Sequence, residues 1–336
     1  MLLRTLAVVA FTLVATTGCS EQSELSSDLH LAFWNVENLF DTVDDPSVDG
    51  DEEFTPTSAK AWTEQRLAIK TGNLARVITD MNDGDGPDIL GLCEIENRAV
   101  VELLVANLAS LERQYEIIQR DSPSGRGIDC AIMYDRQRID LRSHDFIFVA
   151  AGNTRDIVEA EFAVDEHPFY VFVNHWPSRG NPESHRIIAA TTLRDRIDKL
   201  LAADSAADIV VLGDLNDEPT NVSVRQYLRA TGDIASLTPG TLYNSMWPIH
   251  VDSDAGTYVF ENRWEVIDHV ILSPGLLQQD GLRWLRGTTE VIRHDYQMYV
   301  PSDGNSIPRP SRSYTGDDFH ADGYSDHLPV ACALVY

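Results

Sequence analysis

Short apolar runs bounded by polar residues are the feature that most constrains how this 336-residue chain folds. Their length and their wealth of β-branched and aromatic residues predict strands, and together they supply a sizeable core. The runs cover residues 29–36, 88–95, 115–120, 130–135, 169–176, 208–215, 265–272 and 328–336.

Two helical periodicities lie between these runs, in residues 60–81 and 183–202. Apolar residues recur there at spacings of three and four, which predicts amphipathic helices. Other runs, between residues 115 and 176, follow one another without a helix. The mixture predicts an α+β domain over residues 29–336, a sandwich in which helices cover paired sheets. The helical positions are Trp62, Leu67, Ile69, Leu74, Val77 and Ile78 in the first segment and Ile187, Ala190, Leu193, Ile197 and Leu201 in the second.

The first 28 residues predict export. Arg4 is followed by apolar and small residues as far as Gly18, which is typical of a secretory signal and too short for a membrane span. The small residues directly before Cys19 resemble a bacterial lipoprotein processing box, so residues 1–19 are expected to be the signal peptide with Cys19 as the lipidation site. Residues 20–28 would be a tether. We expect an exported protein held by its lipid alone in the bacterial cell envelope, at the outer membrane. An ordinary cleaved signal is the alternative.

Acidic residues outnumber basic ones by 53 to 26, a formal charge of −27. Such a chain lacks the basic footprint of a protein that binds nucleic acid by charge alone, so phosphate chemistry would need a metal or a local pocket. An apolar fraction of 43% excludes a disordered acidic chain. Cys93, Cys130 and Cys332 lie in apolar runs, which predicts buried thiols and no zinc site.

Two segments are irregular. Residues 41–57 carry seven acids between Asp41 and Glu53 and are either a calcium loop or a solvated acidic loop. Their spacing departs from the EF-hand pattern, which favours the solvated loop. Residues 301–325 are rich in Pro, Gly, Ser and Asp and predict a long surface loop, a candidate wall for a site.

Polar side chains stand where the apolar runs begin or end. A single one would be a satisfied buried polar group, but their recurrence indicates strand ends that converge on one site. Carboxylates suit a hard cation and histidines suit proton transfer, which together predict metal-assisted hydrolysis of a phosphate ester. These residues are Asn35, Glu94, His175, Asp214, Asn216, Asp268, Asp326 and His327.

The order of WNVEN, LCE, NHW, GDLND, IDH and YSDHLPV resembles the endonuclease/exonuclease/phosphatase superfamily over residues 29–336. This superfamily includes deoxyribonucleases, abasic-site endonucleases, inositol polyphosphate phosphatases and neutral sphingomyelinases. The resemblance implies a four-layer α/β/β/α sandwich and a Mg²⁺ or Mn²⁺ cofactor, with Ca²⁺ as an alternative.

Matched motif by motif, the resemblance also implies roles. Glu94 corresponds to the acidic metal ligand, with Asn35 and Asp326 in the same metal and phosphate network. Asp214 and Asn216 correspond to the pair that contacts the scissile phosphate and the attacking or leaving oxygen.

The two histidines are implied to be catalytic. His327 matches the catalytic histidine held by Asp268, and either His327 or Asp214 serves as the general base. His175 matches the second histidine, and Asp129 stands where a carboxylate orients it. A turn acid is the equal alternative for Asp129.

Two arginines follow His175. Arg179 and Arg186 either clamp a phosphate or pair with local acids such as Glu183, and both interpretations stay open. The leading hypothesis is a monomeric extracytoplasmic nuclease or phosphodiesterase that cleaves DNA, RNA or nucleotides by in-line attack of an activated water. A phosphomonoesterase or a sphingomyelinase-like phospholipase is the second hypothesis, favoured by the acidity, and a non-catalytic binding lipoprotein is the third.

Overall fold

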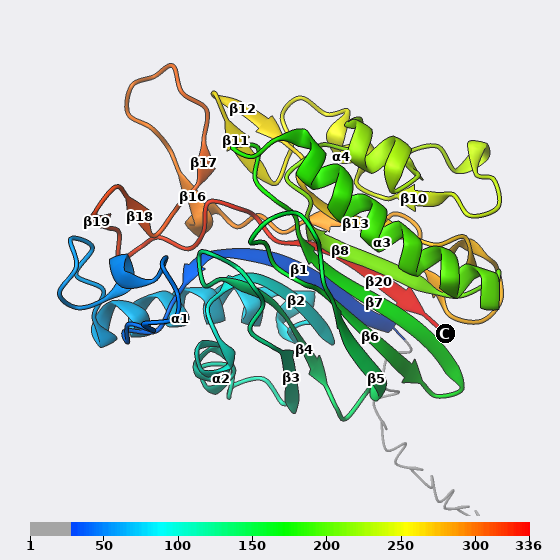
Figure 1. The fold of residues 1–336 in the computed structure, drawn as a ribbon, viewed down its shortest axis with the longest axis horizontal. Coiled ribbons are helices and arrows are strands. Elements are labelled where there is room, and N and C mark those ends of the chain that lie inside the picture. The colour runs from blue at the N-terminus through cyan, green and yellow to red at the C-terminus, as the bar shows by residue number, and fades with distance from the viewer. Residues whose placement is uncertain (1–27) are drawn as a thin grey trace, which may run out of the picture.

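The computed structural model describes residues 28–336, which form four layers (Figure 1). Two mixed sheets pack face to face, and helices cover their outer surfaces: α1 (Glu64–Asp80) and α2 (Arg98–Ala106) on one sheet, α3 (Glu183–Ala203) on the other. The predicted four-layer α+β sandwich is confirmed. The expected signal peptide, Cys19 and residues 20–27 of the expected tether lie outside the described residues, whereas Asp28 already belongs to the first strand, β1 (Asp28–Leu39). Within residues 28–336 no helix has the length and apolar character needed to cross a membrane.

The first sheet has the strand order β14-β20-β1-β2-β4-β3, with β15 also paired to β20. Its strands β1 and β2 run parallel, whereas β20 pairs antiparallel with β1 and β4 antiparallel with β2. The strands are β1 (Asp28–Leu39), β2 (Ile89–Ile95), β3 (Tyr115–Gln119), β4 (Asp129–Asp135), β14 (Arg283–Trp284), β15 (Glu290–Val291) and β20 (Val330–Val335).

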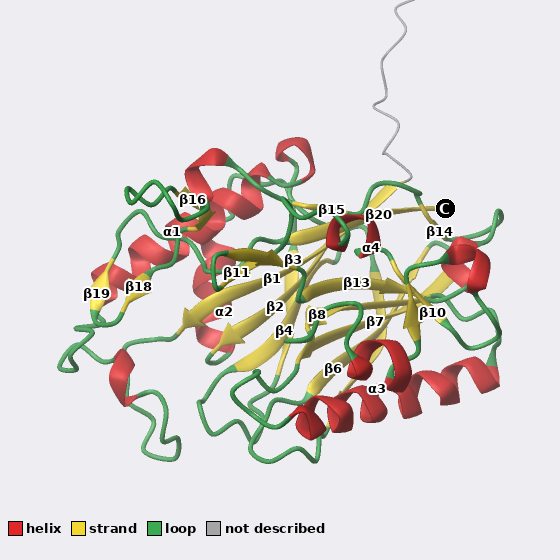
Figure 2. Ribbon diagram, turned by 90° about the horizontal axis from the view of Figure 1, so that it is seen from above, coloured by secondary structure: helices red, strands yellow, loops and turns green. Residues whose placement is uncertain are grey.

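The second sheet has the order β5-β6-β7-β8-β13-β10-β9. Strands β7 and β8 run parallel, and β13 pairs antiparallel with β8. The strands are β5 (Asp140–Ile147), β6 (Ile157–Val164), β7 (His167–His175), β8 (Ile209–Asp214), β9 (Ala230–Thr231), β10 (Leu242–Asn244) and β13 (Asp268–Leu272). Seen from above, α3 runs along one side of these strands (Figure 2).

The central strands are apolar throughout because both of their faces are covered. In β1, Leu31 and Phe33 face the core between the sheets, whereas Ala32 and Trp34 face the layer of α1 and α2. A strand buried on both faces has no polar side to alternate with. The unbroken apolar runs in the sequence therefore became the inner strands of both sheets.

Helix α3 buries a slightly different stripe from the predicted one. Ala190 and Leu193 are buried as expected, but Ile187 is only half-buried. Two arginines take part in the buried face instead, because Arg186 is paired with Asp217 and Arg194 with a carboxylate one turn along the helix. A paired guanidinium is buried at much lower cost than a free one.

Short hairpins and short helices lie around the two sheets. Three hairpins gather at the end of the sheets away from the C-terminus (Figure 1). They are β11 (Tyr258–Phe260) with β12 (Arg263–Glu265), β16 (Met298–Tyr299) with β17 (Arg309–Pro310), and β18 (Tyr314–Thr315) with β19 (Asp318–Phe319). A short helix α4 (Trp247–His250) and short turns of 3₁₀ or π type at Glu52–Phe54, Asn82–Gly84, Ser223–Tyr227, Ile234–Ser236, Gly275–Leu277 and Asp295–Gln297 complete the fold.

The three cysteines in the described part of the chain are buried free thiols in strands, as predicted. Burial raises the pKa of the Cys93 thiol well above its usual value and raises that of Cys332 to about 12. Both thiols are therefore protonated, inert parts of the core at neutral pH.

Candidate active site

The strand pairing brings the polar strand ends to one edge of the sandwich. In the first sheet Asn35 lies opposite Cys93, so Asn35 and Glu94 share this edge. In the second sheet the parallel pairing sets His175 beside Asp214, and the antiparallel strand β13 sets Asp268 on the other side of Asp214. Residues far apart in the sequence thus surround one cavity of about 470 Å³. Its lining includes Glu94, His175, Asp214, Asn216, Asp326 and His327.

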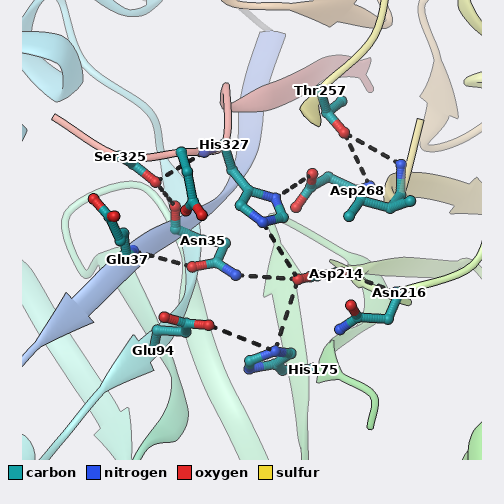
Figure 3. Close-up of polar contacts among 12 residues, drawn as sticks. Asn35, Glu37, Glu94, His175, Asp214, Asn216, Thr257, Asp268, Ser325 and His327 are labelled. Carbon is teal, nitrogen blue, oxygen red and sulfur yellow. Dashed lines mark hydrogen bonds and ion pairs between the residues drawn. The ribbon is translucent and has the colours of Figure 1, made fainter. Parts of the chain in front are cut away.

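Asp214 is the centre of the polar network (Figure 3). Its Oδ2 accepts a hydrogen bond from Nδ2 of Asn35 at 3.0 Å, and its Oδ1 accepts from the backbone N–H of Asn216 at 2.8 Å. The same Oδ2 lies 3.7 Å from Nε2 of His175 and 3.8 Å from Nε2 of His327. One buried carboxylate therefore stands between two imidazoles. Burial raises the pKa of Asp214 to about 7, although the charge of His327 opposes the shift.

His327 is held by a carboxylate, as expected. Its Nδ1 lies 2.8 Å from Oδ2 of Asp268, and Ser325 and Trp34 hydrogen-bond to its backbone N–H and carbonyl. The pair leaves Nε2 directed at Asp214 and the cavity. Burial alone lowers the pKa of His327, but the charges of Asp268, Asp214 and Asp326 outweigh it and raise the pKa well above 6.5.

His175 has the opposite character. Burial, reinforced by Arg155 and Arg126, lowers the pKa of His175 well below 6.5, so its ring is neutral. Its Nδ1 has no hydrogen-bond partner among the described residues. The cavity therefore combines one neutral and one positively charged imidazole.

The structure does not bring Asp129 to His175. The Asp129 carboxylate accepts hydrogen bonds from the backbone N–H and the hydroxyl of Ser122. A β-bulge in β2 shifts the register so that Asp129 lies opposite Ile95, and its side chain lines a separate cavity beside the acidic loop. Asp129 is the first residue of β4 and makes no hydrogen bond to His175, so the expected orienting contact is not formed.

Glu94 is presented to the cavity by that bulge. Its φ of 60° lies in the left-handed region, and Asn216 has a φ of 51°. Such backbone conformations cost non-glycine residues about 1–3 kcal/mol each and persist only where the surroundings enforce them. The Glu94 carboxylate accepts from the N–H of Asn38 at 2.9 Å through Oε2, and its Oε1 lies 3.7 Å from Nη1 of Arg126.

The cavity holds groups that could bind a metal ion. Asp214, Asp268 and His327 are buried with one ligand atom each, all within 4.8 Å of one another. Nδ1 of His327 and Oδ2 of Asp268 already bond to each other, so the oxygens available to a cation are those of Asp214, Glu94 and Asp326 and also Oδ1 of Asp268, which has no hydrogen-bond partner among the described residues. An oxygen donor set suits a hard cation such as Mg²⁺ or Mn²⁺.

Asn35, expected to be a metal ligand, has a positioning role as well. Its Nδ2 donates to Asp214, and its Oδ1 accepts from the backbone N–H of Glu37 at 3.0 Å. Only one lone pair of that oxygen is left for a cation. Asp326 lines the cavity and is paired with Arg312 at 2.9 Å.

The two arginines after His175 separate into different roles. Arg179 lines the cavity, with its guanidinium 2.6 Å from Glu265 and stacked 4.8 Å from the ring of Phe260. Arg186 is buried elsewhere, paired at 2.8 Å with Asp217 and donating to the carbonyl of Ser178. Arg186 therefore stabilises the start of α3. Of the two arginines expected to bind a phosphate, only Arg179 lines the cavity.

Two further arginines line the cavity and were missed in the sequence. Arg155 is buried and donates to the carbonyl of Trp176 at 3.1 Å, and its Nε has no hydrogen-bond partner among the described residues. Arg126 is exposed and donates to the side chain of Asn38 at 2.5 Å. Arg155 lies just before the apolar strand β6, so a search for polar residues at strand ends could have identified it. Arg126 lies in a loop and had no such signal.

The hairpin of β11 and β12 also supports the site without a sequence signal. The Thr257 hydroxyl accepts from the backbone N–H of Asp268 at 3.2 Å. Tyr258 pairs with His327 through a backbone bridge, and their rings lie 4.8 Å apart. The hairpin thus fixes both members of the pair formed by His327 and Asp268.

The sandwich and its cavity define a protein of the phosphoesterase class. The chain belongs to the Endonuclease/Exonuclease/phosphatase family, whose model matches residues 30–335. No curated protein matches the chain.

Solved structures show the same fold at low identity. TDP2 of Caenorhabditis elegans, in truncated form, is 17% identical with a TM-score of 0.57, and the alignment covers 92% of this chain and 98% of that one. The mannosyl-6-phosphatase of Bacteroides thetaiotaomicron is 17% identical with a TM-score of 0.56, over 92% and 100% of the two chains. The human Nocturnin catalytic domain, with a bound sulfate anion, is 17% identical with a TM-score of 0.55, over 92% and 95%.

Proposed function

We propose that this protein is a Mg²⁺- or Mn²⁺-dependent phosphodiesterase that cleaves nucleic acid or nucleotides. The observation that carries the proposal is the position of Asp214 between two imidazoles, one of which is held by Asp268. A nucleophile and a phosphate oxygen need to be held at once in an in-line displacement, and this arrangement offers a group for each.

The roles of the residues follow from the geometry. Asp214 and Asn216 orient the attacking water, because both line the cavity and the backbone N–H of Asn216 holds the Asp214 carboxylate in place. His327 and His175 contact phosphate oxygens from either side of Asp214 and move the proton of the water or of the leaving group. A divalent cation held by Glu94 and Asp326 would neutralise phosphate oxygens and stabilise the charge that develops in the transition state.

Local charge makes an anionic substrate reasonable in a chain of net charge −27. Arg126, Arg155 and Arg179 line the cavity together with Glu94, Asp214 and Asp326, so guanidinium groups offset the local acids although the protein as a whole is acidic. Guanidinium groups bind phosphate oxygens in two-point contacts. The global charge therefore weakens long-range attraction without preventing binding at short range.

Hydrolysis assays test the proposal. Purified protein lacking residues 1–19 is incubated with Mg²⁺ and plasmid DNA, bis-p-nitrophenyl phosphate, p-nitrophenyl phosphate or sphingomyelin. We expect nicking of the plasmid and turnover of the diester, both abolished by EDTA and by Asp214→Ala. Turnover of sphingomyelin alone would show that the protein is a phospholipase and not a nuclease. A complete lack of EDTA-sensitive turnover would favour a binding protein.

A phosphomonoesterase is the second candidate, and the three arginines favour it. A terminal phosphate carries about two negative charges, and a cavity with several guanidinium groups suits that extra charge. One of the structurally similar proteins is named as a mannosyl-6-phosphatase. Turnover of p-nitrophenyl phosphate without turnover of either diester would establish this candidate.

The place of action is a separate proposal that depends on the sequence alone. Arg4, the apolar run and the small residues before Cys19 support export and lipid anchoring in the bacterial envelope. Membrane fractionation of cells that carry Cys19→Ser tests it, with release into the soluble fraction as the expected result. Retention of the variant in membranes would contradict the lipid anchor.

A further inference from the structure

A second group of acidic side chains lies outside the catalytic cavity, in the acidic loop of residues 41–57. Asp44, Asp51 and Glu52 each offer a carboxylate oxygen within 4.8 Å of the other two. No Lys or Arg among residues 28–336 forms an ion pair with any of the three. None of them lines the catalytic cavity. Three negative charges this close repel one another unless a cation lies between them.

Asp51 supplies an independent indication of a ligand. Its side chain is buried, with the residue only 2% exposed. Oδ2 accepts a hydrogen bond from the backbone N–H of Asp45 at 2.7 Å, but Oδ1 has no hydrogen-bond partner among the described residues. A buried carboxylate oxygen without a donor is costly, and coordination of a cation removes that cost.

We propose that Asp44, Asp51 and Glu52 form a Ca²⁺ site, called here the loop site. Oxygen-only ligands on an irregular loop suit Ca²⁺, which accepts six to eight oxygens in flexible geometry. Mg²⁺ demands a near-octahedral set and gives up its water reluctantly, so it fits this loop less well. The calcium interpretation of the acidic segment therefore gains support that its sequence spacing did not give.

The loop site is connected to the catalytic cavity through close packing. Gly50 rests on the backbone of Arg126, so that a Cβ at position 50 would stand 2.6 Å from the Arg126 Cα. Arg126 in turn reaches Asn38 and lies 3.7 Å from Glu94. A cation in the loop site would hold this wall of the cavity in place.

Thermal unfolding with and without CaCl₂ tests the proposal, because it does not depend on catalysis. At a Ca²⁺ concentration about a hundredfold above its Kd, we expect the Tm of the wild-type protein to rise by about 5 °C relative to EDTA. The rise should vanish in Glu52→Gln and Asp51→Asn. It should persist in Glu53→Gln, the matched control, since Glu53 is exposed and pairs with Lys60 at 3.3 Å. It should persist also in Glu94→Gln, which disables the catalytic cavity.

The variants in EDTA give a second measurement. Without a cation, removal of one charge relieves repulsion, so Asp51→Asn should unfold at the same or a higher temperature than the wild type. That result also shows that the variant folds. Loss of the Ca²⁺ effect in Glu94→Gln alone, or its persistence in Asp51→Asn and Glu52→Gln, would overturn the loop site. So would a wild-type Tm that does not respond to Ca²⁺.

Discussion

The two ends of the first sheet both bury carboxylates, and they do so in different ways. At the end where β1 and β2 begin, Asp88 is fully buried and both of its oxygens accept hydrogen bonds. It accepts from Arg113 at 2.5 Å, from Arg138 at 2.6 Å and from the backbone N–H of His30 at 2.7 Å. Asp135 accepts from the backbone N–H of residue 114 at 3.1 Å. This end is a closed network of matched charges.

At the end where these strands finish, Asp326 pairs with Arg312 and Glu94 lies near Arg126, but the central carboxylate, Asp214, has no arginine partner among the described residues. Asp214 meets an amide and two imidazoles, and Glu94 keeps an oxygen directed at a cavity. The buried carboxylate of Asp214 is surrounded here by imidazoles, which can lose or gain protons. The comparison teaches that the groups paired with the buried carboxylates, and not the number of charges, separate a structural cluster from a reactive one.

The largest expected effect belongs to the reactive end. His327→Ala should lower kcat by about 10³–10⁴-fold, equal to about 4–5.5 kcal/mol of transition-state stabilisation. Diester turnover measures the loss after correction for the folded fraction, because the variant leaves the buried Asp268 without its imidazole partner and lowers the stability as well. His144→Ala, an exposed histidine on β5, is the control. Equal activities of His327→Ala and His144→Ala would contradict the assignment of catalysis to this end of the sheet.

The structural end should show the reverse. Asp88→Ala removes the buried carboxylate that Arg113, Arg138 and the backbone N–H of His30 share and should lower the free energy of unfolding by about 3–5 kcal/mol. Denaturant titration measures this loss, and the folded fraction should keep its kcat. Asp140→Ala, an exposed acid at the start of β5, should change stability by less than about 0.5 kcal/mol. A loss of kcat without a loss of stability would show that Asp88 acts in catalysis and not in stability.

The histidine of the structural end gives a pH prediction. Burial lowers the pKa of His30 to about 4, below its unfolded value of 6.5, so the unfolded chain takes up the proton first. Its contribution is complete above pH 6.5 and is lost as the pH falls towards 4, at about 3 kcal/mol for the full shift. Unfolding titrations at pH 7 and pH 4.5 measure the loss, which His30→Gln should reduce. An identical loss in the variant would exclude His30 as its source.

The smallest expected effect concerns substrate binding at the reactive end. Arg179 is a third exposed and contacts the cavity wall from one side, so Arg179→Met should raise KM by about tenfold, or about 1.4 kcal/mol, with kcat nearly unchanged. Steady-state kinetics on the diester separate the two constants. A fall in kcat at constant KM would instead show that Arg179 acts only in the transition state.

The sequence by itself determined the layers and the polar strand-end residues that line the site. Runs that are apolar throughout need cover on both faces, and this requirement is local enough to be read from composition and length. Polar residues at strand ends, such as Glu94, Asp214 and His327, meet at one edge because strand pairing leaves them no other place. These residues could be predicted as a group without coordinates.

Only the tertiary structure decided how these groups act. The bulge at Glu94 moved Asp129 away from His175, and burial made His175 neutral whereas carboxylates kept His327 charged. Arg126 entered the cavity from a loop, where it reaches Asn38 and Glu94. Register shifts, desolvation and the sum of charges all depend on neighbours distant in sequence, so no local pattern could have specified them.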